Sequence, residues 1–207
     1  MRGSFKCGAA ALLALGANGL VGCSQEPEQL LAVTDDAWSL DSEASRLSYV
    51  SIKAGEIAEV NRFETIEGAV TPDGRAVIQI DLSSVKTGVD IRDERMRDVF
   101  FEVADNPTAT VTAQLDPSVF EALAVGESTT QVLDGQLAVR GIEAPFETEV
   151  TVTRAGPDRV LAVSDTPIIV EAGRYDLIER LGQLQELAGL PSITPAVPVT
   201  FSLAFER

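Results

Sequence analysis

Apolar and polar residues alternate one by one along several segments of this chain, and this period of two constrains its fold more than any other feature. Successive side chains of a β-strand point to opposite faces, so such a segment has one apolar face and one polar face. A helix would instead repeat its apolar residues every three or four positions. The alternation predicts antiparallel strands that bury one face. It is found over residues 76–82, 109–115, 135–140, 146–153 and 199–206.

Turn-forming residues separate these segments, as in Pro72-Asp73-Gly74 and Asn106-Pro107. Many strands joined by short turns, each apolar on one side only, satisfy either a sandwich of two sheets or a closed barrel. The alternation alone does not choose between these two folds. We therefore expect an all-β protein.

Two segments change to the helical period. The first spans residues 90–104 and places Met96 and Phe100 four positions apart, with Asp90 where an N-cap residue is expected. It should end before Asn106-Pro107, because the residue before a proline disfavours the helical conformation.

The second helical segment lies near the C-terminus. Leu177, Leu181, Leu184 and Ala188 fall along one stripe, and Gly189 follows where a C-cap is expected. This pattern predicts an amphipathic helix.

The first 22 residues have the layout of a secretory signal peptide. Arg2 and Lys6 form its positive start, and a short apolar stretch covers residues 9–20. A membrane-spanning helix needs about 20 apolar residues. We therefore expect this segment to be removed from the mature protein.

Leu20-Val21-Gly22-Cys23 resembles the bacterial lipobox, in which the cysteine is acylated and becomes the new N-terminus. The alternative is ordinary cleavage near Ala17, with Cys23 left unmodified. One acyl chain binds a membrane only marginally, so several chains on Cys23 would be needed for a firm anchor. Ser24, rather than an aspartate, follows the cysteine, which in a two-membrane bacterium matches the pattern for sorting to the outer membrane. We expect a lipoprotein signal peptide (1–22), an acidic tether (23–35) and one folded domain (36–207).

The charge of the mature chain argues against a nucleic-acid partner. Residues 1–22 hold two basic residues and no acids, so their removal leaves 14 of the 16 basic residues against all 32 acidic ones, a formal charge of −18. Such a surface repels nucleic acid and anionic lipid headgroups. The acids are scattered along the chain, which is typical of a solvated exterior.

The mature chain lacks the side chains of most common catalytic centres. It has no histidine, and its two cysteines are Cys7, which is removed, and Cys23. These absences exclude Ser-His triads, cysteine nucleophiles within the domain and the usual zinc sites. Its two lysines, Lys53 and Lys86, lie in no recognisable motif, and no phosphate-binding or calcium loop is present. We expect no catalytic residues, no metal and no cofactor.

Four longer motifs follow one another along nearly the whole mature chain, from about Trp38 to Phe205. They are WSLDSEASRLSYVS, then GAVTPDGRAVIQIDLSSVKTGVDIRDERMRDVFFEVADNPTATVTA, then LDGQLAVRGIEAPFETEVTV, and finally VPVTFSLAF. Together these motifs resemble the YceI-like family of bacterial periplasmic lipid-binding proteins.

The resemblance implies an antiparallel, lipocalin-like β-barrel of about eight strands with two short helices. The interior of such a barrel holds a long isoprenoid or fatty-acyl chain, and family members are secreted to the periplasm or attached as lipoproteins. The charged run VKTGVDIRDERMRDVFFEVADN would then be a helical cap at the barrel mouth, with Met96, Phe100 and Phe101 facing the interior. The alternative is that these three side chains simply fill the core.

The chain departs from the family pattern in two places. Asn61 stands where many relatives have a histidine, so no role that depends on that imidazole carries over. The region 174–198 is longer and more helical than in many members. The helix within it, over residues 177–187, would cover the barrel, serve a protein partner or pack on the outside, and we expect outside packing.

A lipid ligand also agrees with the small size of the inward residues. The mature chain has few aromatic residues, namely seven phenylalanines, two tyrosines and Trp38. Alanine occupies inward positions such as Ala69 and Ala109. Small inward side chains leave an eight-stranded barrel room for one slender ligand. Eleven residues are expected to line the barrel and contact that ligand: Phe63, Ile78, Ile80, Met96, Phe100, Phe101, Val111, Ala113, Phe146, Val150 and Phe201.

These observations favour non-catalytic binding or carriage of a long apolar lipid, a polyisoprenoid or a fatty-acyl chain. The protein would act in the periplasm, anchored to a membrane, the outer one in a two-membrane cell, through its N-terminal lipid. The alternative is a structural or adaptor lipoprotein whose barrel is filled by its own side chains and which acts through protein contacts. A homodimer is left open.

Overall fold

The computed structural model describes residues 36–207. The signal peptide, the anchor residue Cys23 and the tether therefore lie outside the described residues, and their assignment stays a prediction. No helix in the described part of the chain is long and apolar enough to cross a membrane.

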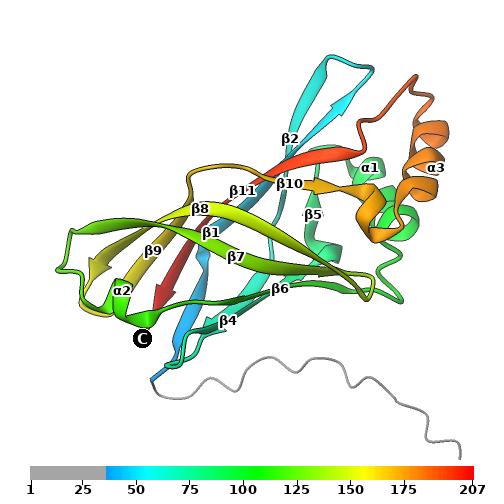
Figure 1. The fold of residues 1–207 in the computed structure, drawn as a ribbon. Coiled ribbons are helices and arrows are strands. Elements are labelled where there is room, and N and C mark those ends of the chain that lie inside the picture. The colour runs from blue at the N-terminus through cyan, green and yellow to red at the C-terminus, as the bar shows by residue number, and fades with distance from the viewer. Residues whose placement is uncertain (1–35) are drawn as a thin grey trace, which may run out of the picture.

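Eight antiparallel strands form a closed barrel (Figure 1). Going round the ring, the hydrogen-bonded order is β1, β3, β4, β6, β7, β8, β9 and β11, and β11 pairs with β1 to close it. The expected barrel of about eight strands is confirmed, and the sandwich is not formed. The ring strands are β1 (Trp38–Lys53), β3 (Ile66–Val70), β4 (Arg75–Asp81), β6 (Thr108–Gln114), β7 (Ser128–Val139), β8 (Ile142–Gly156), β9 (Arg159–Ser164) and β11 (Ala196–Glu206).

Three further strands extend one end of the ring. β2 (Ile57–Phe63) pairs with the second half of β1, β5 (Val85–Lys86) pairs with β2, and β10 (Ile168–Glu171) pairs with the first half of β11. The first residues of β1 pair instead with β3, and the register between β1 and β11 shifts between Asp41 and Arg46. The long strand β1 thus belongs both to the ring and to the extension.

The strand register places the alternating apolar residues opposite one another. Between β4 and β6, Ile78 lies opposite Val111 and Ile80 lies opposite Ala109. These side chains share one face of the sheet, which the ring turns inward. In this pair of strands each isoleucine therefore lies opposite a smaller side chain, which leaves space on the inner face.

Three helical segments lie together at one end of the barrel (Figure 1). α1 (Asp90–Arg95) runs directly into the π-helix η2 (Met96–Phe101), and η2 packs against α3 (Ile178–Ala188). Two single turns, η1 (Leu82–Ser84) and η3 (Ala172–Tyr175), lead into these helices. We call α1, η2 and α3 the cap.

The helix termini agree in part with the predictions. Gly189 is the C-cap of α3, with a left-handed φ of 62°, as expected. The prediction of Asp90 as the N-cap of the first helix was wrong, because Val89 is the N-cap and makes no side-chain capping bond. Asp90 is the first helical residue, where a negative charge stabilises the helix dipole. The segment leaves the helical conformation after Phe101, three residues earlier than expected.

The other end of the barrel is closed by aromatic packing. α2 (Pro117–Glu121) brings Phe120 against Trp38, with ring centroids 6.3 Å apart in an edge-to-face arrangement. Both side chains are buried. The guanidinium groups of Arg154 and Arg207 lie over the Trp38 ring, 5.2 Å and 4.5 Å from its centroid. The barrel is therefore shut at this end and capped at the other.

Candidate functional site: the cavity inside the barrel

A cavity of about 580 Å³ lies inside the barrel. Its volume falls within the range of about 300 to 1,000 Å³ that is usual for ligand sites. Its wall reaches from Trp38 and Phe120 at the closed end to the cap, and side chains from every strand of the ring contribute to it. Most of these side chains are apolar, because the inward positions of alternating strands carry the apolar residues.

All eleven residues that the sequence assigns to the barrel lining lie on the cavity wall. That they contact a ligand stays a prediction. They come from β2 (Phe63), β4 (Ile78, Ile80), η2 (Met96, Phe100, Phe101), β6 (Val111, Ala113), β8 (Phe146, Val150) and β11 (Phe201).

A glycine makes room for one of these rings. Gly135 of β7 lies opposite Phe146 of β8. A Cβ atom added at Gly135 would come within 2.4 Å of the Phe146 ring. The missing side chain therefore lets the phenyl ring lie across the neighbouring strand.

The π-helix places two adjacent aromatic residues on the wall together. Phe100 and Phe101 have ring centroids 4.9 Å apart, and Phe101 also contacts Phe63 at 6.0 Å. Phe63 in turn lies 5.7 Å from Tyr49. In a regular α-helix two consecutive side chains diverge by about 100°, and in this π-helix both rings lie on the cavity wall. Such local π-turns are common at functional sites.

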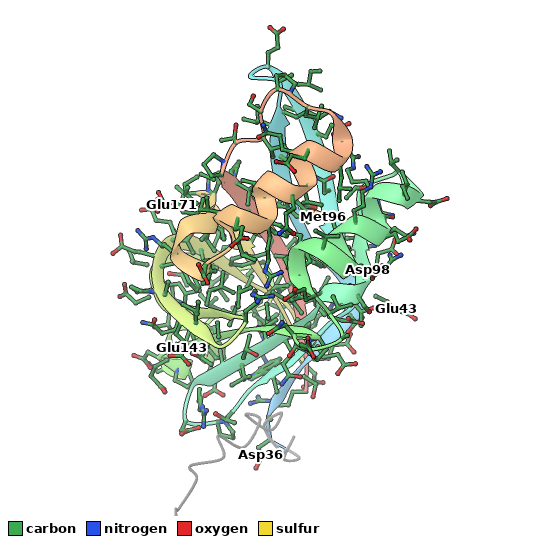
Figure 2. The ribbon with its side chains drawn as sticks, turned by 90° about the vertical axis from the view of Figure 1, so that its right-hand side faces the viewer. Asp36, Glu43, Met96, Asp98, Glu143 and Glu171 are labelled. Carbon is green, nitrogen blue, oxygen red and sulfur yellow. The ribbon has the colours of Figure 1, made fainter. Side chains whose placement is uncertain are left out.

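The helix α3 covers the barrel end, so the expectation that it packs on the outside was wrong. Leu177, Leu181, Leu184 and Ala188 all line the cavity. Figure 2 looks onto this end, where α3 lies beside the η2 segment that carries Met96. The apolar stripe of α3 could be predicted from the sequence. The surface that it packs against could not, because a segment about eighty residues earlier in the chain forms it.

Ion pairs hold the cap to the barrel. The Glu102 carboxylate accepts a hydrogen bond from Arg140, in the turn between β7 and β8, at 2.8 Å. Its other oxygen lies 2.5 Å from the guanidinium of Arg180 on α3. These two arginines hold the pKa of Glu102 below its usual range. One carboxylate thus connects the end of η2, the barrel rim and α3.

A buried carboxylate fixes the start of α1. Asp93 is only 2% exposed and accepts hydrogen bonds from the Thr87 N–H and hydroxyl, at 2.7 and 2.6 Å. Burial alone would raise the pKa of Asp93, but the bonds from Thr87 and the nearby Lys86 lower it below its usual range. Asp93 therefore ties α1 to the residue Thr87, which precedes the helix.

The capped end of the cavity is polar, which the sequence reading missed. Tyr49, Ser51 and Lys53 of β1 and Glu59 and Asn61 of β2 line it. On both strands these residues continue the inward-facing positions, so the period of two was the signal that could have found them. Thr87, Arg92 and Arg95 complete this part of the wall from the α1 region.

Ion pairs organise part of this polar end. Glu59 pairs with Lys53 at 2.9 Å and with Arg92, whose other terminal nitrogen donates to the Thr87 carbonyl at 2.5 Å. The hydrogen bond from Lys53 is the main cause of a lowered pKa for Glu59. The cavity as a whole thus offers an apolar channel with a charged and hydrogen-bonding end. Among the described residues no group of three or more histidine, cysteine or acidic side chains is placed to hold a metal.

Comparison with known proteins gives a family and several similar folds. A family model described as the YceI-like domain matches residues 38–205. No curated protein matches the chain. Among solved structures, a polyisoprenoid-binding domain from Saccharophagus degradans, implicated in plant cell wall breakdown, is 36% identical with a TM-score of 0.80. The match covers 82% of this chain and 98% of that one.

Two more distant structures show the same fold. BcnA from Burkholderia cenocepacia is 17% identical with a TM-score of 0.60, over 80% of this chain and 98% of its own. The YCEI protein of Campylobacter jejuni is 12% identical with a TM-score of 0.51, over 71% of this chain and 84% of its own.

Proposed function

The chain belongs to the YceI-like family, and on that premise we propose that it binds and carries one long apolar lipid chain, a polyisoprenoid or a fatty-acyl chain, inside its barrel, without catalysis. The observation that carries this proposal is the apolar cavity of about 580 Å³, shut at Trp38 and Phe120 and capped at its other end. Each methylene transferred from water to such a wall contributes about 0.8 kcal/mol before the cost of ordering the chain.

The similarity to the Saccharophagus protein supports the ligand class. That protein is described as a polyisoprenoid-binding domain, and this chain shares 36% of its residues over 98% of its length. The eleven lining residues are the side chains that would contact the lipid, since all of them lie on the wall.

The alternative of a filled barrel has less support. A barrel packed solid by its own side chains would leave no continuous space, whereas the cavity passes between inward residues of every ring strand. An additional role in contacting a protein partner, or in forming a homodimer, is compatible with a hollow barrel.

Periplasmic location and membrane anchoring are part of the proposal. They rest on the signal-like pattern of residues 1–22 and on the lipobox-like Leu20-Val21-Gly22-Cys23. Incorporation of a labelled fatty acid into the full-length protein tests the anchor. We expect label in the wild type and none in Cys23→Ala. Equal labelling of both proteins would contradict the acylation of Cys23, and it would not affect the proposal that the barrel binds a lipid.

Lipid extraction and mass spectrometry of the protein lacking residues 1–23 tests the ligand. Removal of Cys23 ensures that any lipid found was bound non-covalently. We expect about one isoprenoid or acyl chain per protein molecule after purification from bacterial cells. A protein that carries no lipid, and that also takes up none when offered prenols and fatty acids, would overturn the proposal.

A further inference from the structure

Four large apolar side chains at the capped end of the barrel are exposed to solvent. They are Ile57 of β2 (47% exposed), Val89, the N-cap of α1 (45%), Ile91 of α1 (51%) and Leu187 of α3 (51%). Single exposed apolar side chains are ordinary on a protein surface, whereas several on neighbouring elements mark an interaction surface. We call these four residues the rim.

The elements that carry the rim lie together at one end of the molecule (Figures 1 and 2). The ion pair between Glu59 and Arg92 joins β2 to α1. On α3, Leu187 follows Arg180 by seven residues, about two turns, so both lie on one side of the helix. That side faces η2, because Arg180 pairs with Glu102 at the end of η2. Leu187 therefore lies on the side of α3 that adjoins the α1 and η2 segment.

The rim is continuous with the wall of the cavity. Val89 and Ile91 line the cavity although each is about half exposed. Leu190 and Ile193 also line it, from the segment that follows α3, and Ile193 pairs with Lys53 at the end of β1. The cavity thus opens to solvent between α1, the end of the β1 and β2 hairpin and the segment after α3. A lipid chain can pass from the rim to the interior along apolar side chains.

Charges of both signs lie beside the rim. α1 carries Asp90 and Glu94 together with Arg92 and Arg95, and Lys86, which precedes the helix, is 42% exposed. A surface of mixed sign gains little from an anionic bilayer, and the net negative charge of the whole chain repels one. Zwitterionic headgroups carry one charge of each sign, so they can pair with both kinds of side chain. The charges beside the rim therefore favour a neutral bilayer, with the apolar side chains supplying the attraction.

We propose that the rim docks the barrel on the surface of a zwitterionic phospholipid bilayer, and that lipid passes directly between that bilayer and the cavity. The four aliphatic side chains enter the boundary between headgroups and acyl chains, while the charged side chains beside them stay among the headgroups. The lipid then never crosses water, where exposure of its methylenes makes free dissociation slow. The inference rests on the proposed function, because direct transfer requires a cavity that holds a lipid.

Transfer of a fluorescent fatty acid from residues 24–207 to phosphatidylcholine vesicles tests the docking. If the barrel contacts the vesicle, the transfer rate rises in proportion to the vesicle concentration, whereas prior dissociation into water gives a rate that is independent of it. We expect the proportional rise. Transfer to vesicles that also contain phosphatidylglycerol should be slower, because the negative charge of the chain opposes contact. A rate independent of vesicle concentration, or faster transfer to the anionic vesicles, would overturn the proposal.

A double variant isolates the rim from the cavity. Ile57→Asn combined with Leu187→Asn changes two rim side chains that are not on the cavity wall, so loading with fatty acid should stay the same. We expect transfer at a given vesicle concentration to slow about tenfold, because both side chains lose their apolar contact with the bilayer. Val132→Asn combined with Val163→Asn is the matched control, since these residues of β7 and β9 are 56% and 39% exposed and lie outside the rim.

The control pair should transfer lipid at the wild-type rate. Equal rates for the rim pair and the wild type would show that the rim does not dock. Sedimentation without vesicles checks the other occupant: a wild-type dimer that the rim pair converts to a monomer would make the rim an interface between two copies and contradict the bilayer assignment.

Flotation of the ligand-free protein with the same vesicles separates this inference from the proposed function. We expect the wild type to float with phosphatidylcholine vesicles and the rim pair to remain behind. A protein that floats but takes up no fatty acid would contradict the proposed function and support the docking. A protein that takes up fatty acid, does not float and transfers it at a rate independent of vesicle concentration would carry lipid without the docking proposed for the rim.

Discussion

At the scale of single residues, the cavity depends on small side chains at inward positions. Ala113 of β6 lies opposite Ala76 of β4, and both alanines are on the wall. A larger residue at either position would project into the space that the lipid is proposed to fill. The inward alanines are thus where a substitution should change binding without disturbing the sheet.

We predict that Ala113→Trp abolishes lipid uptake and leaves the free energy of unfolding close to that of the wild type, because the indole enters an empty space. Thr110→Trp is the control, since Thr110 lies on the same strand with the opposite parity and faces outward. Uptake of a fluorescent lipid and urea unfolding measure the two effects. A loss of stability of about 1 to 3 kcal/mol in Ala113→Trp, typical of an overpacked core, would show that the barrel has no room.

A second prediction concerns Asp93 and pH. Its pKa is lowered in the folded protein, so its charge stabilises the fold at pH values above the unfolded pKa of about 3.9, and this contribution is lost as the pH falls through the folded pKa. Asp93→Asn should therefore lower the free energy of unfolding by about 1.5 to 3 kcal/mol near neutral pH. The difference from the wild type should shrink as the pH is lowered towards about 3.

Urea unfolding across this pH range makes the measurement. Asp98→Asn is its control, because Asp98 is exposed on the same helical segment, as Figure 2 shows. A difference between Asp93→Asn and the wild type that stays constant from neutral to acid pH would contradict the assigned role of the carboxylate.

At the scale of elements, the cap is the part of the fold most suited to movement. The ring strands hold one another by ladders of hydrogen bonds, whereas α3 and η2 are joined to the barrel end mainly by the apolar stripe and by Glu102. A lipid that enters or leaves the barrel must pass this end, because Trp38 and Phe120 shut the other. We therefore expect the contacts that hold α3 and η2 to the barrel end to limit the rate of lipid exchange.

We predict that Glu102→Gln speeds lipid release about two- to fivefold, the size expected for loss of partly exposed ion pairs. The unfolding midpoint should change little, because the side chain is 35% exposed. Stopped-flow transfer of a fluorescent lipid to vesicles measures release. Glu186→Gln, an exposed change on α3 itself, should release lipid at the wild-type rate. Equal rates for Glu102→Gln and the wild type would show that these ion pairs do not hold the cap closed.

At the scale of the whole molecule, local patterns in the sequence predict the strands but not how the ring closes. The alternation through Ile78 and Ile80 correctly assigns inward faces, since period two is a local property. Closure depends on β11 pairing with β1, as in Phe205 opposite Leu40, and no local signal specifies a pairing over that separation. The choice of barrel over sandwich came from the family resemblance.

The candidate site also has one part that local patterns predict and one part that depends on the folded chain. All eleven assigned residues lie on the apolar wall. Eight of them lie on strands, where the inward parity is a local property, whereas Met96, Phe100 and Phe101 lie on η2 and were assigned from the family resemblance. The polar end was missed: the inward positions of Tyr49 and Asn61 follow from the period of two, but only the folded chain brings them beside Arg92 of α1. Asn61 drew notice in the sequence as a departure from the family, but its neighbours did not.

The most direct test of the account is a crystal structure of residues 24–207 purified with the lipid that it carries. We predict continuous electron density for one chain that runs from the capped end, beside Tyr49, to the aromatic pair of Trp38 and Phe120. Lipid bound only on the outer surface, with solvent or side chains filling the barrel, would contradict the central claim that the interior is the binding site.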